Sequence, residues 1–238
     1  MDLANLFTNL MWVVYALAFP FLMVLTLGFL TSGSYGEVIT SYDYYGLTMM
    51  IYLITNAATY SANSFMEERI IKPNLRIVHS PVRSWLILFS KVAATFVFCS
   101  VTYIVAGVIL HLVAGVNYGG DKTWALLLIM LLANFLFSAL GVMVCTAFKQ
   151  ESNANQLISL LAALFAALGG LFFPVEGLGQ AFVTLSWASP VKWIFVACLR
   201  IIYDGDLSVL LPTCAVLTLL SVITLLISIR LFKGEDYL

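Results

Sequence analysis

Long apolar segments separated by short polar ones make up almost the whole chain. The six apolar segments cover residues 10–30, 44–65, 85–114, 124–148, 156–173 and 209–231. A helix that crosses a bilayer needs about 20 apolar residues, and in lipid every backbone N–H and C=O needs an internal partner. A membrane β-barrel would instead show alternating segments of about ten residues. The pattern therefore predicts an all-α integral membrane protein with six transmembrane helices.

Composition narrows this picture further. Of the 238 residues, 62% are hydrophobic and 10% are charged, so the six segments leave little room for a soluble domain. We expect residues 1–238 to form a single transmembrane domain. The net charge of −1 argues against a nucleic-acid partner. The four cysteines lie in apolar segments and lack the spacing of a zinc site.

Basic residues are concentrated on one side of the predicted membrane, mainly in the loop over residues 66–84. Eight of the eleven Lys and Arg fall on that side: Arg69, Lys72, Arg76, Arg83, Lys91, Lys149, Arg230 and Lys233. The side chain of Lys91 is expected to extend to the headgroups there. Because cytoplasmic loops carry an excess of Lys and Arg, we predict a multi-pass protein of the cell membrane with both termini in the cytoplasm. The first span lacks a basic leader and a cleavage site, so we expect it to be retained.

The segment over residues 174–208, between the fifth and sixth spans, is long and partly apolar. Pro174 and Pro190 interrupt it, and neither of its apolar runs is long enough to cross a bilayer. We expect a re-entrant outer hairpin of one or two short helices. Glu176 and Lys192 in this hairpin either pair with each other or lie separately among the headgroups.

Motifs for nucleotide binding and catalysis are absent from the sequence. There is no G-x-x-x-x-G-K-[ST] phosphate loop, so the chain is not expected to bind ATP. The pair Glu67-Glu68 is similar to the E-E-x-x-x-R motif of CAAX-type intramembrane proteases, but position 72 is Lys. His111 is the only histidine in a predicted span, and carboxylate catalysis needs a second group to activate water. We therefore predict a protein that is not an enzyme and holds no cofactor of its own.

Polar residues form a stripe along the second span. Helical spacings of three and four place on one face the residues Thr48, Tyr52, Asn56, Thr59 and Asn63. Amides and hydroxyls that are buried in lipid without partners are costly, so this face must meet another helix or a polar pathway. It lines a substrate path, a subunit seam, or a purely structural interface between helices.

The fifth span instead carries small residues at a spacing of four. Ala162, Ala166 and Gly170 follow the small-x-x-x-small pattern, which lets two helices approach closely. The pattern predicts tight packing, either within this chain or across a dimer, and indicates no chemistry.

Two segments carry a resemblance to a known family. The first reads Met66-Glu67-Glu68-Arg69, followed by Leu75-Arg76, Ser80-Pro81-Val82 and Lys91. The second reads Gly169-Gly170-Leu171-Phe172-Phe173-Pro174-Val175-Glu176, followed by Ala188-Ser189-Pro190. With its six spans and Pro-broken outer hairpin, the chain resembles the ABC-2 type permeases of ABC exporters over nearly its whole length.

The resemblance implies a transport subunit without an ATPase site. Such a subunit pairs with a second permease half, identical or different, and with a separate ATPase subunit that holds ATP and Mg²⁺. The loop 66–84 would dock on the ATPase as a coupling helix, through Glu67, Glu68, Arg69, Lys72, Arg76 and Arg83. The substrate, an amphipathic or hydrophobic peptide, drug or lipid, would leave the cell at the interface of the two halves, near the second and fifth spans.

Two points stay open at the level of the sequence. The family usually begins with a basic amphipathic helix, whereas residues 1–9 contain no Lys or Arg. Residues 2–8 therefore form a shortened elbow helix, or the start is truncated. Two other functions also fit such a membrane protein: an intramembrane protease of the CAAX type, and a non-transporting immunity or scaffold protein.

Overall fold

Every regular element in the described part of the chain is a helix. The computed structural model describes residues 2–33, 35–36, 39–66, 84–148, 150–172 and 179–232. Its elements are α1 (Asp2–Thr8), α2 (Leu10–Leu30), α3 (Ser41–Thr55), α4 (Ala57–Met66), α6 (Ser84–Ala114), the 3₁₀ helix η1 (Gly120–Lys122), α7 (Thr123–Phe148), α8 (Glu151–Gly169), α9 (Gln180–Ser186), α10 (Pro190–Leu199), the π-helix η3 (Arg200–Asp204) and α11 (Leu210–Leu231). The predicted all-α class is confirmed.

Five helices within these residues are long and apolar enough to cross a membrane. They cover Leu10–Leu30, Trp85–Ala114, Gly120–Phe148, Ser152–Gly169 and Leu210–Leu231. These helices correspond to five of the six predicted spans and confirm a multi-pass membrane protein. The fourth of them begins at Ser152 rather than at residue 156, because the helix continues through polar residues that a hydropathy pattern leaves out.

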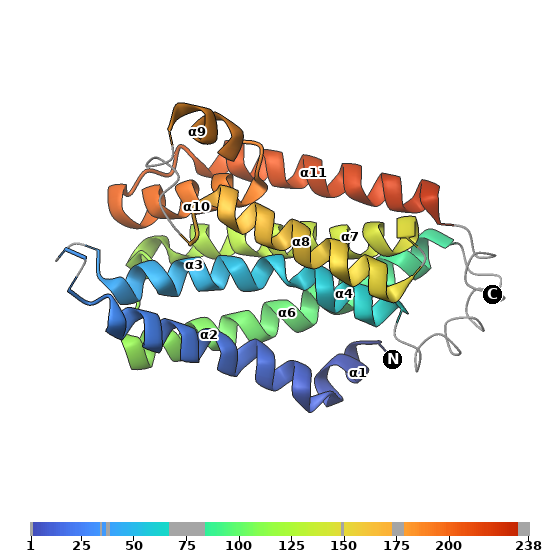
Figure 1. Ribbon diagram of the computed structural model, residues 1–238, viewed down its shortest axis with the longest axis horizontal. Helices are drawn as coiled ribbons and strands as arrows, with labels where there is room; N and C mark the ends of the chain where they lie inside the picture. Colours follow the sequence, from blue (N-terminus) through green and yellow to red (C-terminus); the bar gives the residue numbers. More distant parts are fainter. Residues whose placement is uncertain are drawn as a thin grey trace.

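The predicted span over residues 44–65 is not one continuous helix. The structure divides it into α3 and α4, which follow each other in the same direction (Figure 1) but are separated at Asn56. They contain 15 and 10 residues, and a helix that crosses a bilayer needs about 20. The prediction of a single helix is therefore wrong here, and crossing the membrane requires both halves together.

Helix α7 lies at the centre of the bundle. It contacts α4, α6, α8 and α11. In its most apolar stretch, 61% of the residues are buried within the described chain, compared with 22–33% of the residues in the corresponding stretches of the other four long helices. Those four helices therefore present most of their apolar surface outward, as helices in contact with lipid do. Three of them, α6, α8 and α11, pack on α7, whereas α2 packs on α3 and α6.

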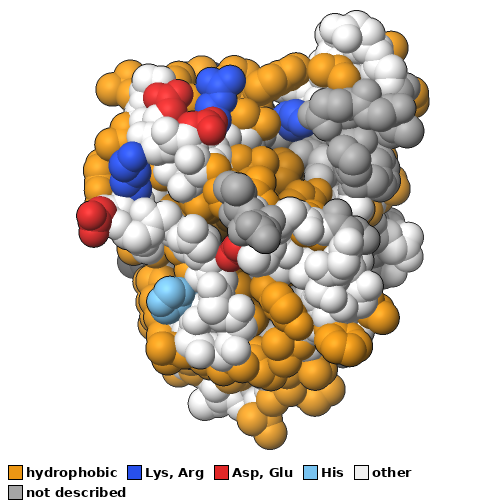
Figure 2. All heavy atoms as spheres, turned by 90° about the vertical axis from the view of Figure 1, so that its left-hand side faces the viewer, with side chains coloured by type: hydrophobic (Ala, Val, Ile, Leu, Met, Phe, Trp, Pro, Cys, Tyr) orange, Lys and Arg blue, Asp and Glu red, His pale blue; other side chains and the backbone are white. Residues whose placement is uncertain are grey.

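The two ends of the bundle differ in character. One end, which we call the termini end, holds α1 and the last turn of α11, and the other, the hairpin end, holds α9 and α10 (Figure 1). Figure 2 faces the hairpin end and shows acidic and basic side chains gathered there among apolar ones. Lys122 donates a hydrogen bond from Nζ to the carbonyl of Gly205 at 2.8 Å. This bond ties the loop before α7 to the loop before α11.

The segment before the last span contains two short helices, as predicted, and its re-entry into the membrane from the outer side stays a prediction. α9 meets the helix formed by α10 and η3 at an angle of 95°. Ser189 caps the start of α10, because its Oγ accepts from the N–H of Val191 at 3.2 Å. The same Oγ donates to the carbonyl of Phe165 on α8 at 2.9 Å. Pro190 takes the first helical position, where its missing N–H removes no helical bond. Val191 packs so closely on Gly169 that a side chain there would clash, so the two parts of the second resemblance segment come close together at Gly169 and just after Pro190.

Lys91 differs from its expected position. Its side chain is 1% exposed, and its Nζ donates to the carbonyl of Ser64 at 3.0 Å. This carbonyl lies in the last described turn of α4. The ammonium group therefore turns into the bundle, and the prediction that it extends to the headgroups is wrong.

Candidate substrate path and subunit seam

Side chains at the junction of α3 and α4 interrupt the helix. Asn56 has a turn conformation, with φ −73° and ψ −8°. The carbonyl of Tyr52 accepts hydrogen bonds from the Thr55 hydroxyl at 2.6 Å, from the Asn56 side-chain amide at 3.0 Å and from the Asn56 N–H at 3.3 Å. Thr and Asn side chains compete in this way with the regular backbone bonds of a helix. The break therefore coincides with the pair Thr55-Asn56.

A hydroxyl on α6 supports the break from outside the helix. Tyr103 is buried, and its Oη donates to the carbonyl of Leu53 at 2.7 Å. The same carbonyl accepts from the N–H of Asn56 at 3.0 Å, three positions along the chain rather than four. A carbonyl that loses its α-helical partner is costly to bury unless another donor reaches it. Tyr103 is such a donor, so the packed bundle maintains the break.

The polar stripe predicted along the second span divides into buried and accessible members. α3 and α4 run between α2 and α8 (Figure 1), and both contact α8. Three members are half-buried: Tyr52, Asn56 and Thr59. The other two, Thr48 and Asn63, are buried. We call the surface of α3 and α4 between α2 and α8, together with the adjoining side of α8, the seam; its accessible polar groups surround the break.

Helix α8 adds polar side chains that the sequence analysis missed. Asn155 donates from Nδ2 to Oδ1 of Asn63 at 2.9 Å, which joins α8 to α4. Beside Asn155 lie the exposed residues Ser152, Gln156 and Ser159, at helical spacings of four and three. Their polarity gives α8 the lowest hydropathy of the five long helices, 1.3 compared with 2.3–2.4. Polar groups on the surface of a spanning helix need a protein or water partner, so this surface suits contact with another subunit or with a polar path.

Aromatic rings border the seam near the break. The ring of Tyr52 lies 5.7 Å from that of Phe172, which follows α8. On α2, Tyr15 stacks on Phe19 at 5.1 Å and is 43% exposed. Tyrosine offers an apolar face and a polar hydroxyl. The seam therefore combines aromatic surface with uncharged amide and hydroxyl groups.

The small residues predicted for helix packing contact other helices of the same chain. Ala162 and Ala166 of α8 are 6% and 0% exposed, and Ala162 lies beside Ala58 of α4. Gly170 ends α8 in the left-handed conformation, with φ +82°, and its carbonyl accepts from Oη of Tyr44 at 3.2 Å. These contacts lie within the chain, and packing of the same residues across a dimer stays a prediction.

Several predicted site residues lie outside the part of the chain that the structure describes. They are the ATPase-coupling residues Glu67, Glu68, Arg69, Lys72, Arg76 and Arg83, and the hairpin residues Pro174 and Glu176. The other two hairpin residues are buried in α10, with Lys192 5% exposed and Pro190 at the start of the helix. The roles predicted for all of these stay predictions. Within the described ranges, no group of three or more His, Cys, Asp or Glu could hold a metal ion.

Comparison with known families identifies the relationship of the chain. The family model described as ABC-2 family transporter protein matches residues 30–230. The chain belongs to the ABC-2 transporter family. This match confirms the resemblance found in the sequence, and it makes the chain the transmembrane subunit of an ABC transporter rather than its ATPase. None of the curated proteins matches the chain. The matched range contains α3, α4 and α8, so the seam lies within the family's own domain.

The hydrogen bond between Asn63 and Asn155 of this ABC-2 subunit can be measured directly. Replacing either residue with alanine is expected to lower the free energy of unfolding by about 1 kcal/mol, as for other bonds between membrane helices. The double variant Asn63→Ala/Asn155→Ala is expected to lose less than the sum of the two, with a coupling energy of about 0.6 kcal/mol. Unfolding in mixed micelles of rising dodecyl sulfate content measures all three values. Strictly additive losses would show that the two amides do not interact.

Proposed function

We propose that this ABC-2 subunit belongs to an exporter that moves an amphipathic or hydrophobic molecule out of the cell. The observation that carries the proposal is the break between α3 and α4, with Tyr52, Asn56 and Thr59 accessible around it. Transporters often bind their substrates at discontinuous spanning helices, because backbone and side-chain polar groups become accessible there. A largely apolar substrate with a few hydrogen-bonding groups matches the rings, amides and hydroxyls of the seam.

The seam also supports pairing with a second permease half. Ser152, Gln156 and Ser159 leave polar groups exposed on a helix that crosses the membrane. A second half, identical or different, would supply partners for them and would enclose the path between the two subunits. In this arrangement α2 and α8 border the path, and α3 and α4 form its wall.

A separate ATPase subunit would supply the energy for export. Residues 67–83 connect α4 to α6, and Lys91 links the same two helices through the carbonyl of Ser64. A push on this connection would therefore move α4 and α6 together, and through α4 it would reach the break at Asn56. We place this connection and both termini in the cytoplasm and the hairpin end outside, because most Lys and Arg lie on the termini side.

Photo-crosslinking and co-purification test this arrangement. A benzoylphenylalanine in place of Gln156 is expected to cross-link to the second half in membranes, whether or not that half is identical. The matched control is the same residue in place of Leu219, which is 61% exposed on α11 and is expected to label lipid. A tagged subunit in mild detergent is expected to retain an ATPase, and ATP is expected to drive an amphipathic dye into inside-out vesicles. Loss of both the cross-link and the ATPase would overturn the proposal.

Replacing Asn56 with leucine is expected to slow transport about two- to tenfold, because one net hydrogen bond is worth roughly 0.5–1.5 kcal/mol. Leucine can neither donate to the carbonyl of Tyr52 nor bond a polar group of the substrate. Initial rates of ATP-driven dye uptake, at equal amounts of protein, measure the effect. The control Asn5→Leu makes the same chemical change at an exposed position of α1 and is expected to transport normally. Unchanged transport and unchanged assembly in Asn56→Leu would make the stripe an ordinary packing face.

A further inference from the structure

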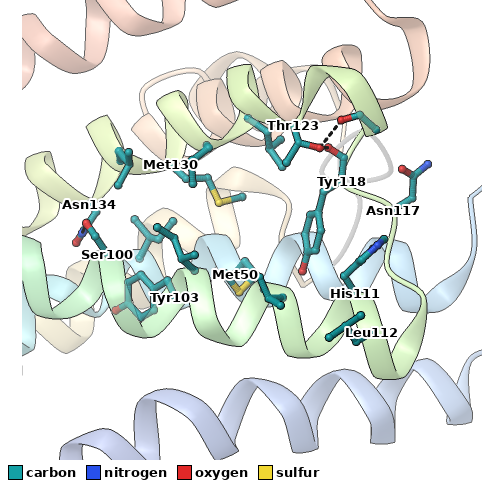
Figure 3. A pocket seen from close by; sticks show the side chains of 18 residues that line it. Met50, Ser100, Tyr103, His111, Leu112, Asn117, Tyr118, Thr123, Met130 and Asn134 are labelled. Carbon is teal, nitrogen blue, oxygen red and sulfur yellow. Dashed lines mark hydrogen bonds between the residues drawn. The ribbon is translucent and has the colours of Figure 1, made fainter.

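A second site lies away from the seam, between α6 and α7. A pocket of about 560 Å³ opens there, with α3 as its floor (Figure 3). The described residues that line it include none of the seam residues Tyr52, Asn56 and Gln156. Small-molecule sites in proteins have volumes of about 300–1,000 Å³, so this pocket is large enough to hold a ligand of its own.

Hydrogen bonds fix both ends of the pocket. At the end near the middle of α7, Asn134 donates from Nδ2 to the carbonyl of Phe96 and to Oγ of Ser100, both at 3.0 Å. At the hairpin end, the N–H of Asn117 donates to Oδ1 of the buried Asp43 at 2.6 Å. The second bond holds the loop between α6 and α7 to the start of α3. The pocket is therefore a built feature of the bundle rather than a gap between loosely packed helices.

One hydroxyl inside the pocket has no hydrogen-bond partner among the described residues. Tyr118, in the loop between α6 and α7, points its hydroxyl into the pocket on the side of Met50 (Figure 3), and its Oη is buried. A buried hydroxyl without a partner costs about 1–3 kcal/mol. Burial, and secondarily the Asp43 carboxylate, raises the pKa of Tyr118 above its usual value. The hydroxyl therefore keeps its proton and remains a donor for an acceptor inside the pocket.

The polarity of the lining changes along the pocket. Its interior is mostly apolar, and polar side chains gather at the hairpin end: His111, Asn117 and Thr123 (Figure 3). Leu112 and Leu127, at its rim, are 76% and 41% exposed on helices that cross the membrane. The pocket therefore opens sideways toward hydrocarbon, with its polar end near the headgroups of the leaflet at the hairpin end.

We propose that this pocket binds one acyl chain of a phospholipid from that leaflet, whose ester carbonyl accepts a hydrogen bond from Tyr118. An acyl chain enters through the lateral opening without crossing water, and the apolar interior matches it. The polar residues at the hairpin end lie where the headgroup of such a lipid would be. A helix of another subunit fits less well, because one helical turn, about 5.4 Å long and about 10 Å across, would already fill most of the pocket. The site is independent of the proposed export path.

Photolabelling in a defined bilayer tests the site. The purified complex is placed in nanodiscs of phosphatidylcholine that contain a small share of ester-linked phosphatidylcholine with a diazirine in the middle of one acyl chain. Irradiation is expected to label Met130 and Tyr103, which line the pocket, and peptide mass spectrometry identifies the labelled residues. In Gly107→Phe the new Cβ would lie 3.6 Å from Cε of Met50 and 3.9 Å from Oη of Tyr118, both of them pocket residues. The ring is therefore expected to occupy the pocket and to lower labelling about tenfold. The control Val101→Phe lies on α6 outside the lining, at a position 45% exposed, and is expected to label normally.

A second probe with ether-linked chains tests the hydrogen bond. In the wild type, the ester probe is expected to label the pocket about two- to tenfold more than the ether probe, which corresponds to one net hydrogen bond. In Tyr118→Phe this preference is expected to disappear, while the ring still fills its place. Melting temperatures show which variants are folded, and Tyr118→Phe decides the question even where Gly107→Phe does not fold.

Three results would overturn the proposal. Equal labelling of Met130 in the wild type and in folded Gly107→Phe would show that the lipid does not occupy the pocket. An ester preference that persists in Tyr118→Phe would show that the hydroxyl does not bind the carbonyl. Absence of lipid labelling, with cross-links from a benzoylphenylalanine at Leu112 to another protein chain, would assign the pocket to a protein partner.

Discussion

Replacing Gly141 with alanine is expected to destabilise the bundle by about 3 kcal/mol, the upper end of the usual cost of overpacking a core. Gly141 lies where the central helix α7 meets α4. A methyl group at this position would lie 2.9 Å from both Cα and the carbonyl carbon of Ala58, and still closer to its carbonyl oxygen. These are backbone atoms, which cannot rotate away as a side chain can, so the two helices would have to separate. Unfolding of the purified subunit in dodecyl sulfate measures the loss.

The matched control for this prediction is Gly107→Ala on α6. It also exchanges a helical glycine for alanine, but the new methyl group would meet Cε of Met50 at 3.6 Å, an ordinary contact. Because alanine is favoured over glycine in a helix by roughly 0.5–1 kcal/mol, Gly107→Ala is expected to be neutral or stabilising. If Gly141→Ala were as stable as the wild type, α4 and α7 could not be as close as the structure shows.

The long helices can be predicted from the sequence, because lipid admits only apolar segments of sufficient length. The break at Asn56 could not be predicted in the same way. Hydropathy is averaged over a window, and the apolar residues around Leu53 hide the competition of Thr55 and Asn56 for a backbone carbonyl. The break also depends on Tyr103, which is distant in sequence and reaches Leu53 only in the packed bundle.

The seam could be predicted in part. Helical spacing shows which polar residues share a face, but it does not show what that face meets. Asn63 faces α8 and is buried, whereas Asn56 on the same stripe stays accessible. Gln156 and Ser159 have an equally regular spacing, and only the bond between Asn63 and Asn155 shows that they adjoin the seam.

The side-chain positions of Lys91 and Tyr118 depend entirely on how the helices pack in the assembled bundle. An extended position at the headgroups is the default for a lysine near the end of a span, but Lys91 instead donates a hydrogen bond to the carbonyl of Ser64 inside the bundle. Tyr118 follows α6 in a polar loop, and nothing in its sequence context indicates that its hydroxyl is buried between two helices. Both positions depend on which helices lie beside each other in the bundle, and a local sequence pattern does not contain this information.

Replacing Glu67 and Glu68 with lysine is expected to lower coupled transport about tenfold or more, because like charges across an interface cost several kcal/mol. We predict from the family resemblance that these carboxylates belong to the ATPase docking surface, and in the chain they follow α4, which contains the residues after the break at Asn56. The subunit is still expected to insert in the membrane, because added lysines strengthen the basic character of this loop. In proteoliposomes with the ATPase, hydrolysis of ATP is expected to continue while dye uptake is lost.

The expected loss of transport depends on the charge of residues 67 and 68 and not on the size of their side chains. The variant Glu67→Asp/Glu68→Asp shortens both side chains and keeps both charges, so it is expected to retain most of the transport. A reversed charge at the facing position of the ATPase is expected to restore uptake to Glu67→Lys/Glu68→Lys and to impair the wild-type subunit, because complementary charges select the partner at such contacts. Wild-type rates of uptake in the double lysine variant, with hydrolysis unchanged, would contradict a coupling role for this pair. The energy of ATP would then have to reach the seam by a route other than the end of α4.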